Sequence, residues 1–225
     1  TLGGLNGSTL ANSRVVFARD QGTPELVTFT GGPITVVNDG AIRIAAGDNR
    51  NLMVPGITTI SSGTGSTAAL TLDVPNNRFR GITSSLTLAS DTTLRVLDSG
   101  STADTGRITA AVVNSLVGTN KNLLKLGNRT LELGADNSAT FTGGSIVNSQ
   151  GTLRVLHDGA LGSATTAVTI ERNATLEIGK ANFVPTAAVT QLAGSIERGN
   201  QEDARGTTYN LPAGVNLQLN TNLQS

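Results

Sequence analysis

Two short motifs place aspartates where paired-carboxylate chemistry is conceivable. Asp98-Ser99-Gly100 and Asp104-Thr105-Gly106 each set a carboxylate before a hydroxyl and a glycine. Two carboxylates that share one proton can act together as acid and base in hydrolysis. Such pairs are brought together from separate lobes or chains, whereas these aspartates are only six residues apart in one Gly/Ser/Thr-rich stretch. We therefore interpret both motifs as turns, in which Asp and Gly are common.

A second motif has the glycine spacing of a phosphate-binding loop. The segment Gly63-Thr64-Gly65-Ser66-Thr67-Ala68 fits the pattern G-x-G-x-x-G/A. That pattern binds a dinucleotide only when a helix N-terminus follows it and receives the pyrophosphate. Here the alternating residues 69–74 and then Pro75 follow, which is typical of a strand. The motif is thus interpreted as a flexible corner, and we expect no cofactor.

The sequence contains few histidine or cysteine side chains that could bind a metal ion or act as a nucleophile. His157 is the only histidine and the chain has no cysteine, which excludes multi-histidine sites, thiolate sites and a cysteine nucleophile. His157 precedes Asp158-Gly159, so we expect it in a solvent-facing turn. Several aspartates near corners could offer oxygens to calcium, but the tandem glycine-aspartate repeat of calcium-binding rolls is missing. We predict no catalytic, cofactor-binding or metal site; the aspartates considered are Asp39, Asp48, Asp98, Asp104, Asp136 and Asp158.

The composition narrows the class of protein further. The 225 residues carry 16 basic and 16 acidic side chains, so the formal net charge is zero and no field would gather nucleic acid. No stretch approaches the roughly 18 consecutive apolar residues of a membrane span. We therefore expect no nucleic-acid partner and no membrane insertion by this segment.

The elements that must position these residues are short alternating strands. Pairs of apolar residues flank polar corners, as in Ile34-x-Val36 before Ile42-x-Ile44 and Val168-x-Ile170 before Leu176-x-Ile178. Alternation points every second side chain to one interior, and the corner residues turn the chain before the next strand. Because the cassette recurs, the sequence predicts a stack of similar coils.

The recurring apolar positions predict an all-β fold, a single-stranded β-solenoid with coils of about 18 to 28 residues. We expect residues 1–225 to form one elongated β-solenoid domain, a segment of a longer chain, with the most regular repeats at 123–180. In that part we expect Leu124, Leu126 and Val147 to share the interior with Leu131 and Leu153. The complete predicted ladder is Ile42, Leu70 or Leu72, Leu94, Val112, Leu131, Leu153, Leu176, Ile196 and Leu217.

Two stretches interrupt the ladder and are predicted to protrude as loops. Both carry charged residues, and the first also carries an aromatic residue, so they are the first places to look for a partner contact. Simple loop variation is the alternative reading of both. The candidate contact residues are Asn76, Asn77, Arg78, Phe79 and Arg80 in the first loop, and Glu197, Arg198, Glu202, Asp203 and Arg205 in the second.

One region resembles a known repeat. Leu131-Glu132-Leu133, the corner Asn137 to Gly144, the strand Gly151 to Val155 and the corner Gly159-Ala160-Leu161-Gly162 follow one another at regular spacing. This order resembles the passenger-associated repeat of autotransporter proteins over residues 124–163. Asn128-Arg129 departs from the glycine-rich lead of that repeat. The resemblance implies a right-handed parallel β-helix, displayed at or released from a bacterial outer surface within a longer polypeptide.

Taken together, these features predict a noncatalytic structural or display module of a secreted or cell-surface bacterial protein, such as an autotransporter-like passenger, an adhesin stalk or a surface fibre. The expected location is extracellular or on the bacterial outer cell surface. The expected partners are a host-surface or matrix ligand, or another copy joined end to end through residues 215–219 and the Val15-Val16-Phe17 strand. A β-helix polysaccharide lyase or hydrolase and a phage or viral fibre segment are the alternatives.

Overall fold

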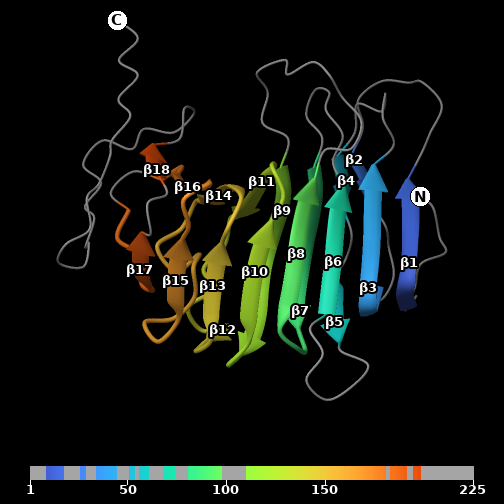
Figure 1. Cartoon of the computed structure of the whole chain (residues 1–225), viewed down its shortest axis with the longest axis horizontal. Coiled ribbons are helices and arrows are strands. Elements are labelled where there is room, and N and C mark those ends of the chain that lie inside the picture. The colour runs from blue at the N-terminus through green and yellow to red at the C-terminus, as the bar shows by residue number, and fades with distance from the viewer. Residues whose placement is uncertain are drawn as a thin grey trace, which may run out of the picture.

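The computed structural model describes residues 9–17, 26–28, 34–44, 51–53, 56–60, 68–73, 81–97, 110–180, 183–191 and 195–198. Within these ranges the chain forms eighteen strands and no helix, and every strand pairing is parallel. The strands follow one another across the molecule from the N-terminal end to the C-terminal end (Figure 1). The β-solenoid predicted from the alternating pattern is confirmed.

One column of strands, here called column A, faces the viewer in Figure 1. Each member pairs in parallel with the next, so equivalent positions of successive coils stack directly. The members are β1 (Thr9–Phe17), β3 (Ile34–Ile44), β6 (Ala68–Asp73), β8 (Thr92–Leu97), β10 (Asn122–Leu126), β13 (Ser145–Asn148), β15 (Ala167–Ile170) and β17 (Ala188–Gln191).

Column B is built in the same way from the other half of each coil. Its members are β2 (Leu26–Thr28), β4 (Asn51–Met53), β7 (Gly81–Leu88), β9 (Ala110–Thr119), β11 (Thr130–Leu133), β14 (Gly151–Val155), β16 (Ala174–Ile178) and β18 (Ser195–Arg198). A third set of pairings runs beside these two columns. The first half of β1 pairs with the first half of β3, which pairs with β5 (Ile57–Ile60). Strand β5 then pairs with the second half of β7, which pairs with the second half of β9, and the end of β9 pairs with β12 (Phe141–Thr142).

Aliphatic side chains fill the interior between these columns. In column B, Leu131 lies opposite Leu153, Leu153 opposite Leu176, and Leu176 opposite Ile196. The first three are almost completely buried. In column A, Ile42 lies opposite Leu72 and Leu72 opposite Val96. Burying aliphatic surface is the main favourable term, at roughly 25 cal/mol per Å², and stacked coils share it.

The predicted ladder is wrong where it passes Leu94. Leu94 lies opposite Lys125, whereas Val112 lies opposite Glu132 and points outward. The single predicted ladder therefore joins the N-terminal part of column A to the C-terminal part of column B. The two columns have the same alternation and similar spacing, so sequence periodicity does not distinguish them. Coils span 20 to 23 residues between Leu131 and Ile196 but 31 residues from Leu94 to Lys125, longer than expected.

The predicted register is also wrong in two strands of column A. In β10, Leu123 and Lys125 are buried while Leu124 and Leu126 are half-exposed. In β13, Ile146 is likewise buried while Val147 is half-exposed. A shift of one residue exchanges the two faces of a strand. The inward positions of β10 and β13 include Lys125 and Asn148. Because polar residues are normally expected on the solvent face, the sequence pattern assigns the opposite face of each strand to the interior.

Candidate functional site

The predicted partner loops fall mostly outside the described residues. Asn76, Asn77, Arg78, Phe79 and Arg80, together with Glu202, Asp203 and Arg205, are not among them. Glu197 and Arg198 are, and they end strand β18, where they pair with Glu177 and Ile178 of β16. These two residues therefore continue column B and do not begin a protruding loop. The partner role of both stretches stays a prediction.

The structure describes only some of the residues that were considered for chemistry. The aspartate motifs at 98–100 and 104–106, Asp48, the glycines of 63–67 and the C-terminal residues 215–219 lie outside the described residues. Ala68, which follows the glycines, begins strand β6 and no helix. At the N-terminal end, Val15 packs against the core, and Val16 is 45% exposed.

His157 lies in a turn after β14, as predicted, together with three charged neighbours. Its Nδ1 is 3.9 Å from Asp136 Oδ2 and accepts a hydrogen bond from the backbone N–H of Gly159. Asp158 forms an ion pair with Lys180 at 3.1 Å and accepts a hydrogen bond from Val184 N–H. Hydrogen bonds from Ser138, with a smaller contribution from His157, lower the pKa of Asp136. These contacts tie three coils together at one corner.

Among the residues that the structure describes, Arg154 is the most buried charged residue on an outer face. It lies on column B between Glu132 and Glu177, its partners in the strand register on either side. Its guanidinium is 3.2 Å from Glu132 Oε2 and 2.6 Å from Glu177 Oε1, and its side chain is 9% exposed. Burial by itself lowers the pKa of Arg154, but the two carboxylates outweigh burial and raise it. One arginine thus holds the carboxylates of two neighbouring coils.

Lys125 is a buried cation inside column A. Its side chain is fully buried, and Nζ donates hydrogen bonds to the carbonyl oxygens of Gly127 at 2.9 Å, Arg129 at 2.7 Å and Gln150. Three carbonyl acceptors match the three N–H donors of an ammonium group. Burial lowers the pKa of Lys125 to about 7. Sequence reasoning missed this residue because a lysine inside an alternating strand is normally assigned to the solvent face.

Asn137 was predicted only as part of a corner, yet it joins three coils. It is fully buried; Oδ1 accepts a hydrogen bond from Leu116 N–H at 2.8 Å, and Nδ2 donates to the carbonyl of Ala160 at 2.9 Å. Its own N–H donates to Gly159 O at 2.9 Å. Leu116 belongs to the preceding coil and Ala160 to the following one. The asparagine therefore replaces strand hydrogen bonds at a place where the chain turns.

Other residues of the repeat segment also make contacts between neighbouring coils. Phe141 is fully buried and packs close to Gly118 of the preceding coil. Gly144 has a φ of +68°, and a Cβ there would lie 2.1 Å from the carbonyl oxygen of Lys121. Only glycine fits such a left-handed position in contact with backbone. Asn148 likewise donates to Thr175 O of the next coil at 2.9 Å.

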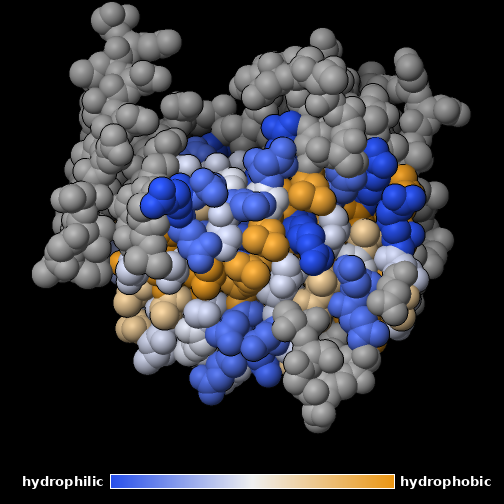
Figure 2. All heavy atoms as spheres, viewed as in Figure 1, coloured by the Kyte–Doolittle hydropathy of each residue, from blue (hydrophilic) through white to orange (hydrophobic). Residues whose placement is uncertain are grey.

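The described ion pairs lie on more than one face of the solenoid. Ion pairs lie on column A (Arg43 with Asp73), on column B (Arg154 with its glutamates) and at the Asp158 corner. The face seen in Figure 2 mixes hydrophilic and hydrophobic patches. Within the described ranges, no three His, Cys, Asp or Glu side chains are grouped so that they could hold a metal ion.

The fold and these contacts define the class of the molecule as a parallel β-solenoid with polar cross-links between its coils. Comparison with protein-family profiles, with curated proteins and with solved structures gives no match. In the part of the chain that the structure describes, no helix is long and apolar enough to cross a membrane.

Proposed function

We propose that this chain is a noncatalytic structural and display module of a secreted or cell-surface bacterial protein, comparable to an autotransporter passenger, an adhesin stalk or a surface fibre. Its role is to hold exposed corners and loops at a distance from the cell. The alternating strands supply a stack that lengthens by adding coils, because each coil makes contact chiefly with its neighbours.

The observation that carries this proposal is the use of the repeat residues. Asn137, Phe141 and Gly144 belong to the segment that resembles the passenger-associated repeat, and each of them contacts a neighbouring coil. None of the three presents a reactive group to solvent. Residues that serve coil stacking support a scaffold role, because they contribute to the stiffness of the stack.

The ion pairs support the same proposal. Glu132 and Glu177 are bound by Arg154, and Asp158 is bound by Lys180. A general acid or base must be available to a substrate with a suitable pKa, whereas these carboxylates are already engaged in contacts between coils. This arrangement supports a role for these carboxylates in holding the coils together rather than in general acid or base catalysis.

Surface labelling tests the location and display. Antibodies raised against the purified chain are applied to intact cells of the producing organism, to permeabilised cells and to the culture medium. We expect labelling of intact cells or recovery from the medium. Labelling that appears only after permeabilisation would contradict the proposal. Recovery of the chain in purified phage particles would support the viral fibre alternative.

A direct assay tests the enzymatic alternative. The purified chain is incubated with acidic and neutral polysaccharides, and the reaction is followed by ultraviolet absorbance for unsaturated lyase products and by a reducing-end assay for hydrolysis. We expect no activity above that of a heat-denatured control. Product formation that requires the folded chain would replace the scaffold proposal with an enzymatic function.

A further inference from the structure

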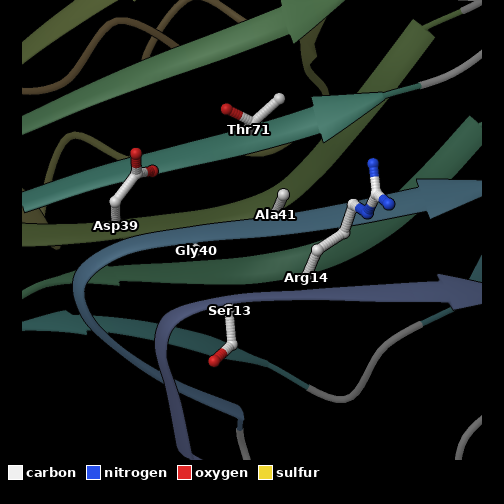
Figure 3. Close-up of a pocket in the computed structure, with 6 residues that line it drawn as sticks. All are labelled: Ser13, Arg14, Asp39, Gly40, Ala41 and Thr71. Carbon is white, nitrogen blue, oxygen red and sulfur yellow. The ribbon is translucent and has the colours of Figure 1, made fainter.

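The outer face of column A is hollowed near its N-terminal end. The hollow has a volume of about 270 Å³. Asp39 lies at one side of it and Arg14 at the other, with Gly40 and Ala41 between them and Thr71 on the next strand (Figure 3). Its lining residues are Ser13, Arg14, Asp39, Gly40, Ala41 and Thr71.

A β-bulge creates one wall of this hollow. Ala11 pairs with Val37, but Ser13 pairs with Gly40, so β3 has one more residue than β1 in this interval. Asn38, inside the bulge, has a φ of +62°. Bulges bend a strand and redirect its side chains. The neighbouring Asp39 consequently stands out from the sheet, with 60% of its side chain exposed.

Two arginines stand at the ends of one row across the sheet. Arg14 lies opposite Ala41, Ala41 opposite Thr71, and Thr71 opposite Arg95. With strands about 4.8 Å apart, the two arginine backbones are separated by about 14 Å. The small side chains between them form a low floor. Of the two arginines, Arg14 lines the hollow, whereas Arg95 lies beyond it at the far end of the row.

Arg14 is the cation in the lining of the hollow that can receive an anionic group. Arg43 is paired with Asp73 at 3.3 Å, whereas Arg95 is 3.9 Å from Asp39, which is too long for a hydrogen bond. Arg14 is exposed and has no ion-pair partner among the residues that the structure describes. The lining of the hollow thus holds one cation, Arg14, and one carboxylate, Asp39, at opposite sides. Asp39 remains available to accept hydrogen bonds from hydroxyl groups.

We propose that this hollow binds a hexuronate unit of an acidic polysaccharide. The Arg14 guanidinium receives the sugar carboxylate through paired N–H donors. The Asp39 carboxylate accepts hydrogen bonds from ring hydroxyls, and the Thr71 hydroxyl adds one polar contact. This binding function goes beyond the display role and does not depend on it, because it is a property of the folded chain in solution.

The size and lining of the hollow select this ligand class. A volume of about 270 Å³ lies just below the range of drug-sized pockets and fits a single ring. No aromatic side chain lines it, so a base or an aromatic ligand has nothing to stack on. Gly40 and Ala41 are the lining residues without a polar side-chain atom. A small ligand with several hydroxyls and one carboxylate satisfies the groups that are present.

Calorimetric titration of the purified chain with a galacturonate trisaccharide tests the proposal, with the neutral galactose trisaccharide as the comparison ligand. Free galacturonate serves as a second probe and shows whether one unit is sufficient. The variants are Arg14→Gln, which removes the charge, and Ala41→Leu, which fills the floor. Arg172→Gln is the matched control, because Arg172 is an exposed arginine in the turn after β15.

We expect Arg14→Gln and Ala41→Leu each to weaken trisaccharide binding by about tenfold or more, as loss of a charge-assisted contact predicts. Arg172→Gln should bind like the unchanged chain, and the neutral trisaccharide should bind far more weakly. Unchanged circular dichroism shows that the variants fold. The proposal is overturned if the acidic trisaccharide does not bind, if the neutral one binds equally well, or if the Arg14 and Arg172 variants behave alike.

Discussion

Lys125 lies directly opposite Leu94 in the interior of column A, so an ammonium group occupies the position that a leucine fills one coil earlier. The lysine reaches the corner at 127–129 and the carbonyl of Gln150, and it thereby fastens two turns of the chain from inside. A buried charge is tolerated only when its donors are satisfied. Here the backbone carbonyls satisfy them.

The depressed pKa of Lys125 predicts a pH-dependent stability. The pKa is about 7 in the folded chain and 10.5 ordinarily, so between these values the unfolded chain binds a proton that the folded chain does not. The free energy of unfolding should therefore rise with pH from about 7 to about 10.5. Urea unfolding at several pH values measures it. In Lys125→Met this contribution disappears, and equal pH slopes in the two proteins would disprove the assignment.

Removing the Asn137 amide should destabilise the solenoid strongly. Asn137→Ala leaves Leu116 N–H and the Ala160 carbonyl without their buried partner. At about 1 to 3 kcal/mol for each of the two unsatisfied groups, the loss should be about 2 to 6 kcal/mol. Asn128→Ala, at an exposed turn position, is the matched control and should change the unfolding midpoint little. Similar losses in both variants would show that the cross-coil bonds contribute no more than an ordinary turn residue.

The glycines of the repeat corner allow a second matched comparison. Gly144→Ala forces a Cβ against the Lys121 carbonyl at a left-handed φ, whereas a Cβ at Gly134 meets no atom within 4 Å. We expect thermal unfolding of Gly144→Ala at a clearly lower temperature and a near-normal midpoint for Gly134→Ala. A Gly144→Ala variant as stable as Gly134→Ala would mean that the corner has a different backbone conformation.

Arg154 should contribute more to the free energy of unfolding than an ordinary surface arginine does. Arg154→Met leaves two carboxylates on one outer face without their common cation, and we expect a loss of about 3 kcal/mol. In a double-mutant cycle with Glu177→Gln, part of this loss should be recovered. Arg172→Met is the control for removing an exposed arginine. Strictly additive effects of Arg154→Met and Glu177→Gln would contradict a direct interaction between the two side chains.

Periodicity was sufficient to predict the class of fold and many interior residues. Leu131, Leu153 and Leu176 were expected inside and are buried there. Aliphatic alternation is a direct consequence of a strand with one dry face, so it can be recognised in the sequence alone. Strands β15 and β16, whose inward positions are all aliphatic, are examples that the pattern assigned correctly.

The errors come from polar residues inside the stack. Lys125 and Asn148 reversed the apparent faces of β10 and β13, because their partners are backbone carbonyls that no pattern reveals. The continuation of Leu94 was misplaced for another reason, namely that columns A and B have the same alternation and similar spacing. The charged row around Arg154 was missed because its residues lie in different coils and meet only through the strand register.

The stacking of successive coils in register is the basis of every proposal made above, and an engineered disulfide tests it most directly. The chain has no cysteine, and Thr152 lies opposite Thr175 on the outer face of column B. Adjacent parallel strands bring such positions to about 4.8 Å, within the range of a disulfide. Thr152→Cys/Thr175→Cys should therefore cross-link under mild oxidation. Thr130→Cys/Thr175→Cys, two coils apart, should not. Cross-linking of the second pair, or failure of the first in a folded chain, would contradict the solenoid.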